Sequence, residues 1–352
     1  MRRPDECLVA LPARTSSRIL MLAQSDRVQV TVRVTERRTH MKAKHDEMPL
    51  SQDQASAILQ SWVGAKTPCI GIEALVGGYC SAVYRLTFDR PPYVAVAKLH
   101  GSSQDCSLSR ESDRLEFLRE HTNVPCPRVY SLDTSRSLVP YSFLLLECLP
   151  GVSLESVRLT EQQRAPVERE LADVVLELHS FTAETFRGID EPRGPGSWLD
   201  VFLPCLEENR RDMQAILPDD LLELLDRVLP LASDALGKHG EPTLIHGDLW
   251  AGNIMVHERE DGWHLSGLLD PVGLRYAEVE MELSYLEVFD TVGQEFFDIY
   301  GRQRPLRPGY SYRRLFYWLD TFMTHIWLGF GPKYQMRLAA ACRELIRLSG
   351  SA

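Results

Sequence analysis

The sequence predicts an α+β fold of two lobes, in which a small antiparallel β-sheet precedes a larger set of helices. Three observations support this prediction. Short β-prone segments separated by Gly and Pro turn signals dominate residues 48–149. Apolar residues at helical spacing dominate residues 150–352. The length of 352 residues is sufficient for two lobes that each bury a core.

The elements of the first lobe follow from local signals. Residues 1–47 carry ten Lys and Arg against six Asp and Glu, without a long amphipathic period, so we expect a disordered tail or a start upstream of the true initiator. The sequence S-Q-D-Q at Ser51 is a capping box that predicts a helix toward Val63. Strands are then expected at residues 70–76, 80–88, 93–99, 128–132 and 142–148, with one helix, residues 109–121, laid on their sheet.

The second lobe begins after Pro150-Gly151, where the periodicity changes. Thr160 starts a second capping box, and the apolar residues that follow it at helical spacing predict a long helix. A β-hairpin is predicted at residues 254–269. Further amphipathic helices are expected at residues 198–216, 219–236, 279–300, 312–328 and 333–348.

Composition narrows the class of protein. No apolar run is long enough to span a membrane and no signal peptide is evident, so we expect a cytoplasmic protein without a membrane partner. The formal net charge of −10 argues against nucleic-acid binding, which needs a surplus of Lys and Arg, but is compatible with a cationic small molecule. The eight cysteines are scattered without metal-ligand spacing, so reduced thiols are expected. We expect a monomer.

The strongest chemical signal is the segment H-G-D-L-W-A-G-N, from His246 to Asn253. In a kinase catalytic loop, an Asp accepts the proton of the substrate hydroxyl, and an Asn five residues later holds magnesium. A second Asp, after a short hairpin, also holds the metal. This spacing predicts Asp248 as the catalytic base and Asn253 and Asp270 as the magnesium ligands. The expected cofactors are ATP and Mg²⁺.

Two residues of the first lobe complete this prediction. Lys98 ends the apolar run V-A-V-A-K in the third strand, where a kinase lysine reaches the α and β phosphates. Glu111, on the helix that follows, is expected to orient Lys98 through an ion pair. Glu116 is the alternative, because helical phase alone does not decide between them.

Four more residues are expected to contact the nucleotide. Gly78 and Ser81 belong to a Gly-rich turn between the first two strands, whose amides could cradle phosphates. Such a turn is also common without any ligand. Glu147 and Leu149 end the last strand of the lobe, where the backbone would bind the adenine edge.

The motif resembles that of the aminoglycoside phosphotransferase and choline kinase superfamily, because His-Gly-Asp replaces the His-Arg-Asp of protein kinases. The resemblance covers roughly residues 70–345 and implies a protein-kinase-like fold. Within this superfamily the chain resembles the fructosamine kinases, whose H-G-D-L-W-S-G-N is similar to H-G-D-L-W-A-G-N here. Val279 stands where those kinases carry Arg, and Glu282 where they carry Asp. The resemblance implies a ketosamine or other amino-sugar as acceptor.

Three residues are candidates for contact with the acceptor. Trp250 could stack on a sugar ring or pack as an ordinary aromatic. Glu280 and Glu282 could face an ammonium group or cap the helix that begins nearby. His246 is expected to orient the catalytic loop through a hydrogen bond.

Three functions are compatible with these residues. The first is an ATP-dependent kinase of a ketosamine or related amino-sugar. The second is an O-phosphotransferase of the same fold that acts on an aminoglycoside or another metabolite. The third is a catalytically inactive pseudokinase that binds nucleotide.

Overall fold

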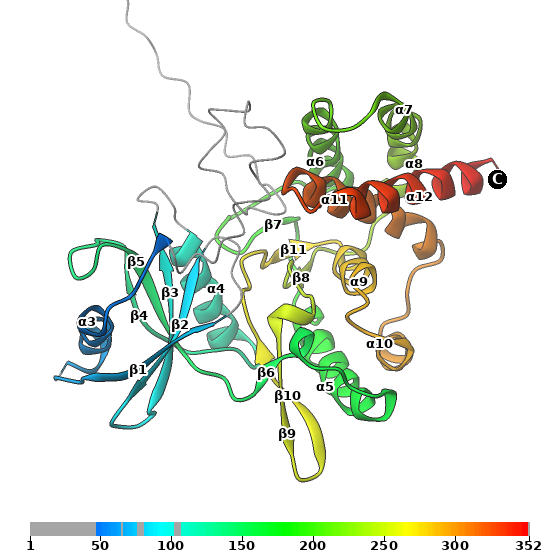
Figure 1. The fold of residues 1–352 in the computed structure, drawn as a ribbon. Coiled ribbons are helices and arrows are strands. Elements are labelled where there is room, and N and C mark those ends of the chain that lie inside the picture. The colour runs from blue at the N-terminus through cyan, green and yellow to red at the C-terminus, as the bar shows by residue number, and fades with distance from the viewer. Residues whose placement is uncertain (1–46, 65, 76–80, 102–106, 351–352) are drawn as a thin grey trace, which may run out of the picture.

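A computed structural model describes residues 47–64, 66–75, 81–101 and 107–350 of the chain. A sheet-rich N-lobe lies beside a larger helical C-lobe, with the polypeptide passing between them near residue 150 (Figure 1). This arrangement confirms the predicted α+β fold. Of the predicted N-terminal tail, only Glu47 falls within the described residues.

Five antiparallel strands form the N-lobe sheet, in the spatial order β1-β2-β3-β5-β4. They are β1 (Cys69–Leu75), β2 (Ala82–Phe88), β3 (Val94–His100), β4 (Val129–Asp133) and β5 (Ser142–Glu147). Their bounds lie within two residues of the predicted ones. The register places Lys98 of β3 between Val83 of β2 and Leu144 of β5, so this lysine lies on the central strand of the sheet.

Both faces of this sheet are covered, whereas one helix was predicted on it. The helices are α3 (Gln52–Val63), with the predicted capping box at Ser51, and α4 (Ser107–His121). Phe143 and Leu145 of β5 pack in the same core as α3, while Leu144 and Leu146 pack with α4. Alternate side chains of a strand point to opposite faces, so the continuous apolar run of β5 required a helix on each side.

Helices form most of the C-lobe, and two of the predicted ones are interrupted. They are α5 (Glu161–His179), α6 (Trp198–Met213), α7 (Asp219–Val228), α8 (Ala232–Leu236), α9 (Val279–Val288), α10 (Gln294–Gln303), α11 (Tyr310–Trp327) and α12 (Pro332–Ser349). The predicted helix 279–300 is the pair α9 and α10, because Asp290 adopts a left-handed φ of 51°. The predicted helix 219–236 contains a 3₁₀ turn, η2 (Leu229–Leu231), with a proline at its start.

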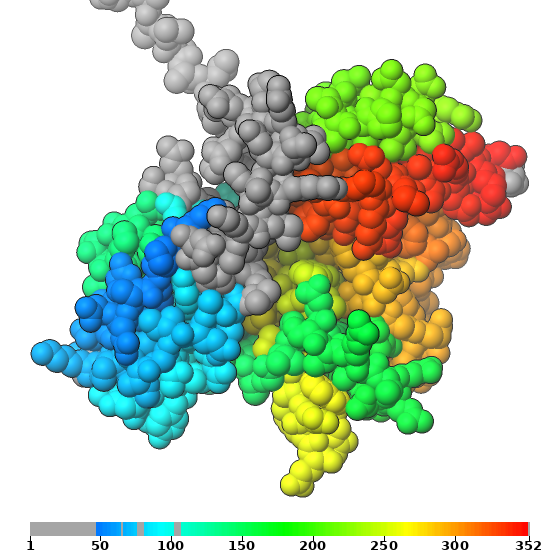
Figure 2. Space-filling view, in the orientation of Figure 1, coloured from blue at the N-terminus to red at the C-terminus, as the bar shows by residue number. Residues whose placement is uncertain are grey.

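Short strands flank the segments that carry the predicted catalytic and metal-binding residues. They are β6 (Val152–Ser153), β7 (Arg187–Gly188), β8 (Thr243–Ile245), β9 (Ile254–Arg259), β10 (Gly262–Leu268) and β11 (Arg275–Ala277). The β9–β10 hairpin confirms the prediction for residues 254–269 and projects in yellow from the molecule in Figure 2. Its base is tied to the N-lobe, because Leu268 N donates to Pro125 O over 2.8 Å.

The hydropathy of the helices and the state of the cysteines can be compared with the expectations from composition. No helix among them is long and apolar enough to cross a membrane. The cysteines within the described residues are free thiols, as expected: Cys69, Cys126, Cys148, Cys205 and Cys342.

Candidate active site

The loop between β8 and β9 carries the predicted catalytic base. Leu249 and Ile254 are fully buried and anchor the loop in the core. Asn253 Nδ2 donates to the Asp248 backbone oxygen over 2.8 Å and to Asp248 Oδ2 over 3.0 Å. Asn253 N also donates to Trp250 O over 2.9 Å, which closes the turn. The two predicted functional residues of the loop are therefore brought side by side.

Gly247 is required by the path of this loop. Its φ is 80°, in the left-handed region that disfavours residues with a Cβ. A Cβ at this position would overlap the carbonyl group of Gly273 in the segment after β10. The glycine of the His-Gly-Asp motif therefore permits the two loops to touch.

Glu282 of α9 binds the backbone of this loop, so it takes neither of the two roles considered for it, facing a substrate ammonium or capping the helix. His246 N donates to its Oε1 over 3.0 Å and Gly247 N to its Oε2 over 2.7 Å. The side chain of His179 also contacts it, and Glu282 is 1% exposed. Burial by itself would raise the pKa of Glu282, but the bonds from His179 and Gly247 lower it, so the carboxylate is ionised and satisfied by the protein.

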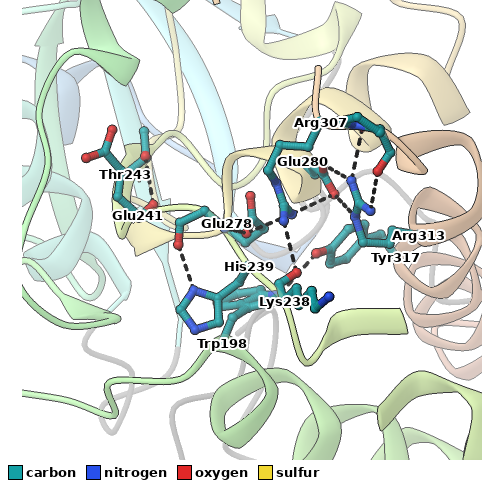
Figure 3. Close-up of polar contacts among 12 residues, drawn as sticks. Trp198, Lys238, His239, Glu241, Thr243, Glu278, Glu280, Arg307, Arg313 and Tyr317 are labelled. Carbon is teal, nitrogen blue, oxygen red and sulfur yellow. Dashed lines mark hydrogen bonds and ion pairs between the residues drawn. The ribbon is translucent and has the colours of Figure 1, made fainter. Parts of the chain in front are cut away.

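Glu280 likewise takes neither of the two roles considered for it, because it is buried in an ion pair. Arg313 of α11 binds its carboxylate with two nitrogens, Nε at 2.7 Å and Nη2 at 2.6 Å (Figure 3). Arg307 Nη2 lies 3.1 Å from the same carboxylate and 3.1 Å from Glu278. Such a bidentate pair is a strong, geometrically specific contact. Glu280 therefore ties α9 to α11 and does not face open space.

His246 links the catalytic loop to the segment that carries Asp270. Its Nε2 lies 3.0 Å from Leu269 O, and Asp248 N donates to its Nδ1 over 3.3 Å. Burial lowers the pKa of His246, so the ring is neutral, and a tautomer with the proton on Nε2 satisfies both contacts. This geometry agrees with the orienting role expected for His246.

Lys98 joins the two lobes at the site. Its Nζ lies 2.8 and 2.7 Å from the two carboxylate oxygens of Glu111, and 2.7 Å from Asp270 Oδ1. Burial would lower the pKa of Lys98, but the charges of Asp270 and Glu111 outweigh it and raise the pKa, so the amine is charged. Glu116, the alternative partner, is exposed. The structure therefore pairs Lys98 with Glu111.

The four residues predicted to contact the nucleotide differ in their surroundings. Gly78 lies outside the described residues, while Ser81 is buried immediately before β2. Glu147, at the end of β5, is bonded to Arg128: its N–H donates to Arg128 O over 2.9 Å and its carboxylate accepts from Arg128 N over 3.1 Å. Leu149 follows β5, with its side chain against Gly267 of β10. The Glu147 N–H is thus not available for adenine.

Tyr285 of α9 is a site residue that the sequence analysis missed. Its hydroxyl donates to Asp248 Oδ1 over 2.8 Å, and the residue is 7% exposed. Tyr285 lies three positions after Glu282, so both side chains lie on the same face of the helix. The three-residue spacing could have identified Tyr285 from the sequence only if Glu282 had already been known to face the loop.

Asp248 is a partly buried carboxyl with two donors and two acidic neighbours. Burial, together with the charges of Asp270 and Glu282, raises its pKa to about 7. The hydrogen bonds from Tyr285 and Asn253 act in the opposite direction, because they favour the ionised form. An acid whose pKa lies near neutrality is suited to accept a proton in this pH range.

Aromatic rings of the C-lobe lie near Asp248, the predicted base. Trp250 lies 6.4 Å from Phe289, Phe289 lies 5.3 Å from His325, and His325 lies 5.3 Å from Phe330, as measured between ring centroids. Trp250 is half-buried and rests against Gly252, where a Cβ would overlap its ring. The packing and stacking readings of Trp250 are both compatible with this position.

The sequence is similar to those of known phosphotransferases and kinases. Residues 71–316 match the model of the phosphotransferase enzyme family (APH). The chain is 27% identical over 294 residues to a probable ketoamine kinase of Staphylococcus aureus, covering 78% of this chain and 93% of that protein. It is 25% identical over 285 residues to a probable ketoamine kinase of Klebsiella aerogenes, covering 78% of this chain and 92% of that protein.

Solved structures show the same fold at lower identity. A protein assigned as a fructosamine-3-kinase from Haemophilus somnus 129PT superposes with a TM-score of 0.64 at 17% identity, covering 82% of this chain and 96% of that one. A thermostable mutant of aminoglycoside phosphotransferase APH(4)-Ia gives 0.61 at 15% identity, covering 84% and 100%. These comparisons confirm the expected protein-kinase-like fold and small-molecule kinase class. The chain belongs to the phosphotransferase enzyme family.

Proposed function

We propose that the protein transfers the γ-phosphoryl group of ATP to a hydroxyl of a ketosamine or related amino-sugar, with the help of Mg²⁺. One observation carries this proposal most directly. Lys98 of the N-lobe contacts both Glu111 and Asp270, while Asp248 and Asn253 are hydrogen-bonded to each other in the loop beneath. These five residues have the chemistry that a kinase needs at its phosphates, metal and base.

The side chains present fit a magnesium ion. Among the described residues no group of three or more His, Cys, Asp or Glu side chains could enclose a metal. Magnesium is instead held by one or two carboxylates together with waters and substrate phosphates. Asp270 supplies a carboxylate, and the amide oxygen of Asn253 accepts no hydrogen bond within the described part of the chain. When bound there, Mg²⁺ would neutralise charge on the transferring phosphoryl group.

The proposed mechanism assigns one task to each residue. The oxygen of the acceptor hydroxyl bonds to the γ-phosphorus while Asp248 accepts the proton of that hydroxyl. The bond from the γ-phosphorus to the β–γ bridging oxygen breaks, and ADP leaves with that electron pair. Lys98, oriented by Glu111, would bind the α and β phosphates. Catalysis would come mainly from positioning and from charge neutralisation.

The acceptor class rests on the relatives. Two curated proteins that resemble most of this chain are named probable ketoamine kinases. The half-buried ring of Trp250, two residues from Asp248, offers an apolar surface for a sugar. An aminoglycoside acceptor is the second candidate, because aminoglycoside phosphotransferases share the fold. The ion-paired Lys98 and hydrogen-bonded Asp248 weigh against an inactive pseudokinase.

The test measures magnesium-dependent ADP release with fructoselysine, in the wild type and in Asp248→Asn. Turnover that is lost in Asp248→Asn is expected, because an amide cannot accept the hydroxyl proton. A panel of aminoglycosides and amino-alcohols run in parallel separates the two acceptor classes. Equal turnover by Asp248→Asn and the wild type would contradict the proposed mechanism.

A further inference from the structure

We propose that Tyr285 is a positioning residue for the catalytic base, whose phenol holds the Asp248 carboxylate in the orientation that receives the acceptor hydroxyl. This inference rests on the proposed function, because it takes Asp248 to be the base. It adds to that function a residue on α9 that does not itself accept or donate the transferred proton.

The two oxygens of Asp248 are held from different elements. Tyr285 of α9 donates to Oδ1 over 2.8 Å, and Asn253 of the loop donates to Oδ2 over 3.0 Å. Two donors on the two oxygens fix the rotation of the carboxylate about its Cβ–Cγ bond. An ionised carboxylate has about four acceptor sites, so each oxygen retains one for the acceptor hydroxyl.

Tyr285 is itself held rigidly. Its ring packs edge-on against Phe289, with centroids 4.8 Å apart. Trp318 Nε1 of α11 donates to Ser284 O over 2.9 Å, which fastens α9 beside it. Glu282 on the same helix binds the backbone of the catalytic loop. One helix therefore positions both the loop backbone, through Glu282, and the side chain of the base, through Tyr285.

The phenol also has an electrostatic reason to act as a donor. Asp248 is partly buried, and the negative charges of Asp270 and Glu282 lie near it. Without the phenol, Oδ1 would lose the donor that holds it and would be free to turn away from these charges. Burial and the adjacent Asp248 raise the pKa of Tyr285 well above its ordinary value, so the hydroxyl keeps its proton.

A buried phenol needs a hydrogen-bond partner in any case, so a matched control is required. Tyr310 provides it. Its hydroxyl donates to Glu287 Oε2 over 3.0 Å, it is 8% exposed, and it also joins α9 to α11. Tyr310→Phe removes the same atom from the same kind of contact, at a carboxylate that has no part in the proposed chemistry.

The experiment compares steady-state ADP release by Tyr285→Phe, Tyr310→Phe, Asp248→Asn and the wild type, with active sites counted by nucleotide titration. Each phenylalanine variant loses one oxygen and keeps its ring packing, so both are expected to fold and to bind ATP. For Tyr285→Phe we expect kcat to fall by about 10- to 100-fold, the scale of a misplaced catalytic group. The KM values for ATP and acceptor should stay within about 2-fold, and Tyr310→Phe should match the wild type.

Two results would overturn the inference. One is a kcat of Tyr285→Phe equal to that of Tyr310→Phe. The other is a loss confined to KM or to the fraction of active sites, which a purely structural contact would produce. The Asp248→Asn sample separates these results from a failure of the proposed function. If Asp248→Asn remains as active as the wild type, the base assignment fails together with the inference; if it is inactive while Tyr285→Phe is fast, only the inference fails.

Discussion

Asp320 of α11 shows how burial acts on a single side chain. It is 3% exposed, and its hydrogen-bond partner among the described residues is Asn209 Nδ2, at 2.7 Å. Burial raises the pKa of Asp320 to about 6, even though Asn209 and the nearby charge of Arg275 act to lower it. One neutral hydrogen-bond donor does not replace the hydration free energy that an ionised carboxylate loses on burial. Such a residue costs folding free energy at neutral pH.

The sign of this effect gives a prediction for stability. The folded pKa lies above the ordinary value of 3.8, so the contribution of Asp320 to stability is fully present below that pH and is lost as the pH rises through about 6. The free energy of unfolding of Asp320→Asn relative to the wild type should therefore rise by about 1 kcal/mol from pH 5 to pH 8. Urea titrations at the two pH values measure it.

Asp226 is the control for this titration. Its pKa is lowered by a hydrogen bond from Arg210, so Asp226→Asn should show no gain on going to pH 8. A difference between Asp320→Asn and the wild type that is the same at pH 5 and pH 8 would show that Asp320 has an ordinary pKa.

At the scale of elements, the catalytic loop depends on what lies against its backbone. Glu282 of α9 binds two of its amides, His246 reaches the segment after β10, and Gly247 touches Gly273. None of these contacts uses the side chain of Asp248, the proposed base. They fix the backbone from which Asp248 and Asn253 project.

Comparing two glycines with positive φ distinguishes the effect of the Gly247–Gly273 contact from the effect of backbone strain alone. Gly247 has a φ of 80° and lies against Gly273, while Gly262, the first residue of β10, has a φ of 131° and no atom within 4 Å of a Cβ built on it. Gly262→Ala should lower stability by about 1 kcal/mol and leave kcat unchanged. Gly247→Ala should lose more stability and nearly all activity, because the loop must shift away from Gly273.

Thermal unfolding and ADP release on the two alanine variants provide the measurement. Equal melting temperatures together with equal activities in Gly247→Ala and Gly262→Ala would mean that the contact with Gly273 is not needed.

At the scale of the whole molecule, the two lobes meet through a shared core and through Lys98. Leu144 and Leu146 of the N-lobe sheet belong to the same buried cluster as Leu249, Ile254 and Leu268 of the C-lobe. Above this core, Lys98 pairs with a carboxylate from each lobe, Glu111 and Asp270. The proposed phosphate site is therefore assembled only when the lobes are held in this relation.

Glu111→Gln tests this arrangement against Glu116→Gln. Glutamine keeps the shape of Glu111 but cannot balance the charge of Lys98, which would then pair with Asp270 alone. We expect the kcat/KM for ATP to fall by about 10-fold or more, as for loss of a charged partner in a buried pair. Glu116 is exposed on the same helix, so its variant should match the wild type. Identical ATP kinetics in the two variants would exclude the orienting role of Glu111.

Much of the fold could be predicted because its signals are local. The capping boxes at Ser51 and Thr160, the strand bounds of the N-lobe and the hairpin after Asn253 depend on residues a few positions apart. The break between α9 and α10 escaped prediction, because the apolar periodicity continues across Asp290 and Gly293 despite the turn tendency of these residues. Helical phase likewise could not choose between Glu111 and Glu116.

Local sequence patterns were enough to predict the α+β class, the H-G-D-L-W-A-G-N motif and four candidate site residues, Lys98, Asp248, Asn253 and Asp270. Their contacts could be known only from the packing of distant segments: Lys98 meets Asp270, 172 positions away, and Tyr285 meets Asp248, 37 positions away. This packing also turned Glu280 and Glu282 from candidates for substrate contact into buried anchors. The physical reason is that caps, turns and strand periodicity arise from short-range backbone preferences, whereas burial and charge pairing depend on how distant elements pack.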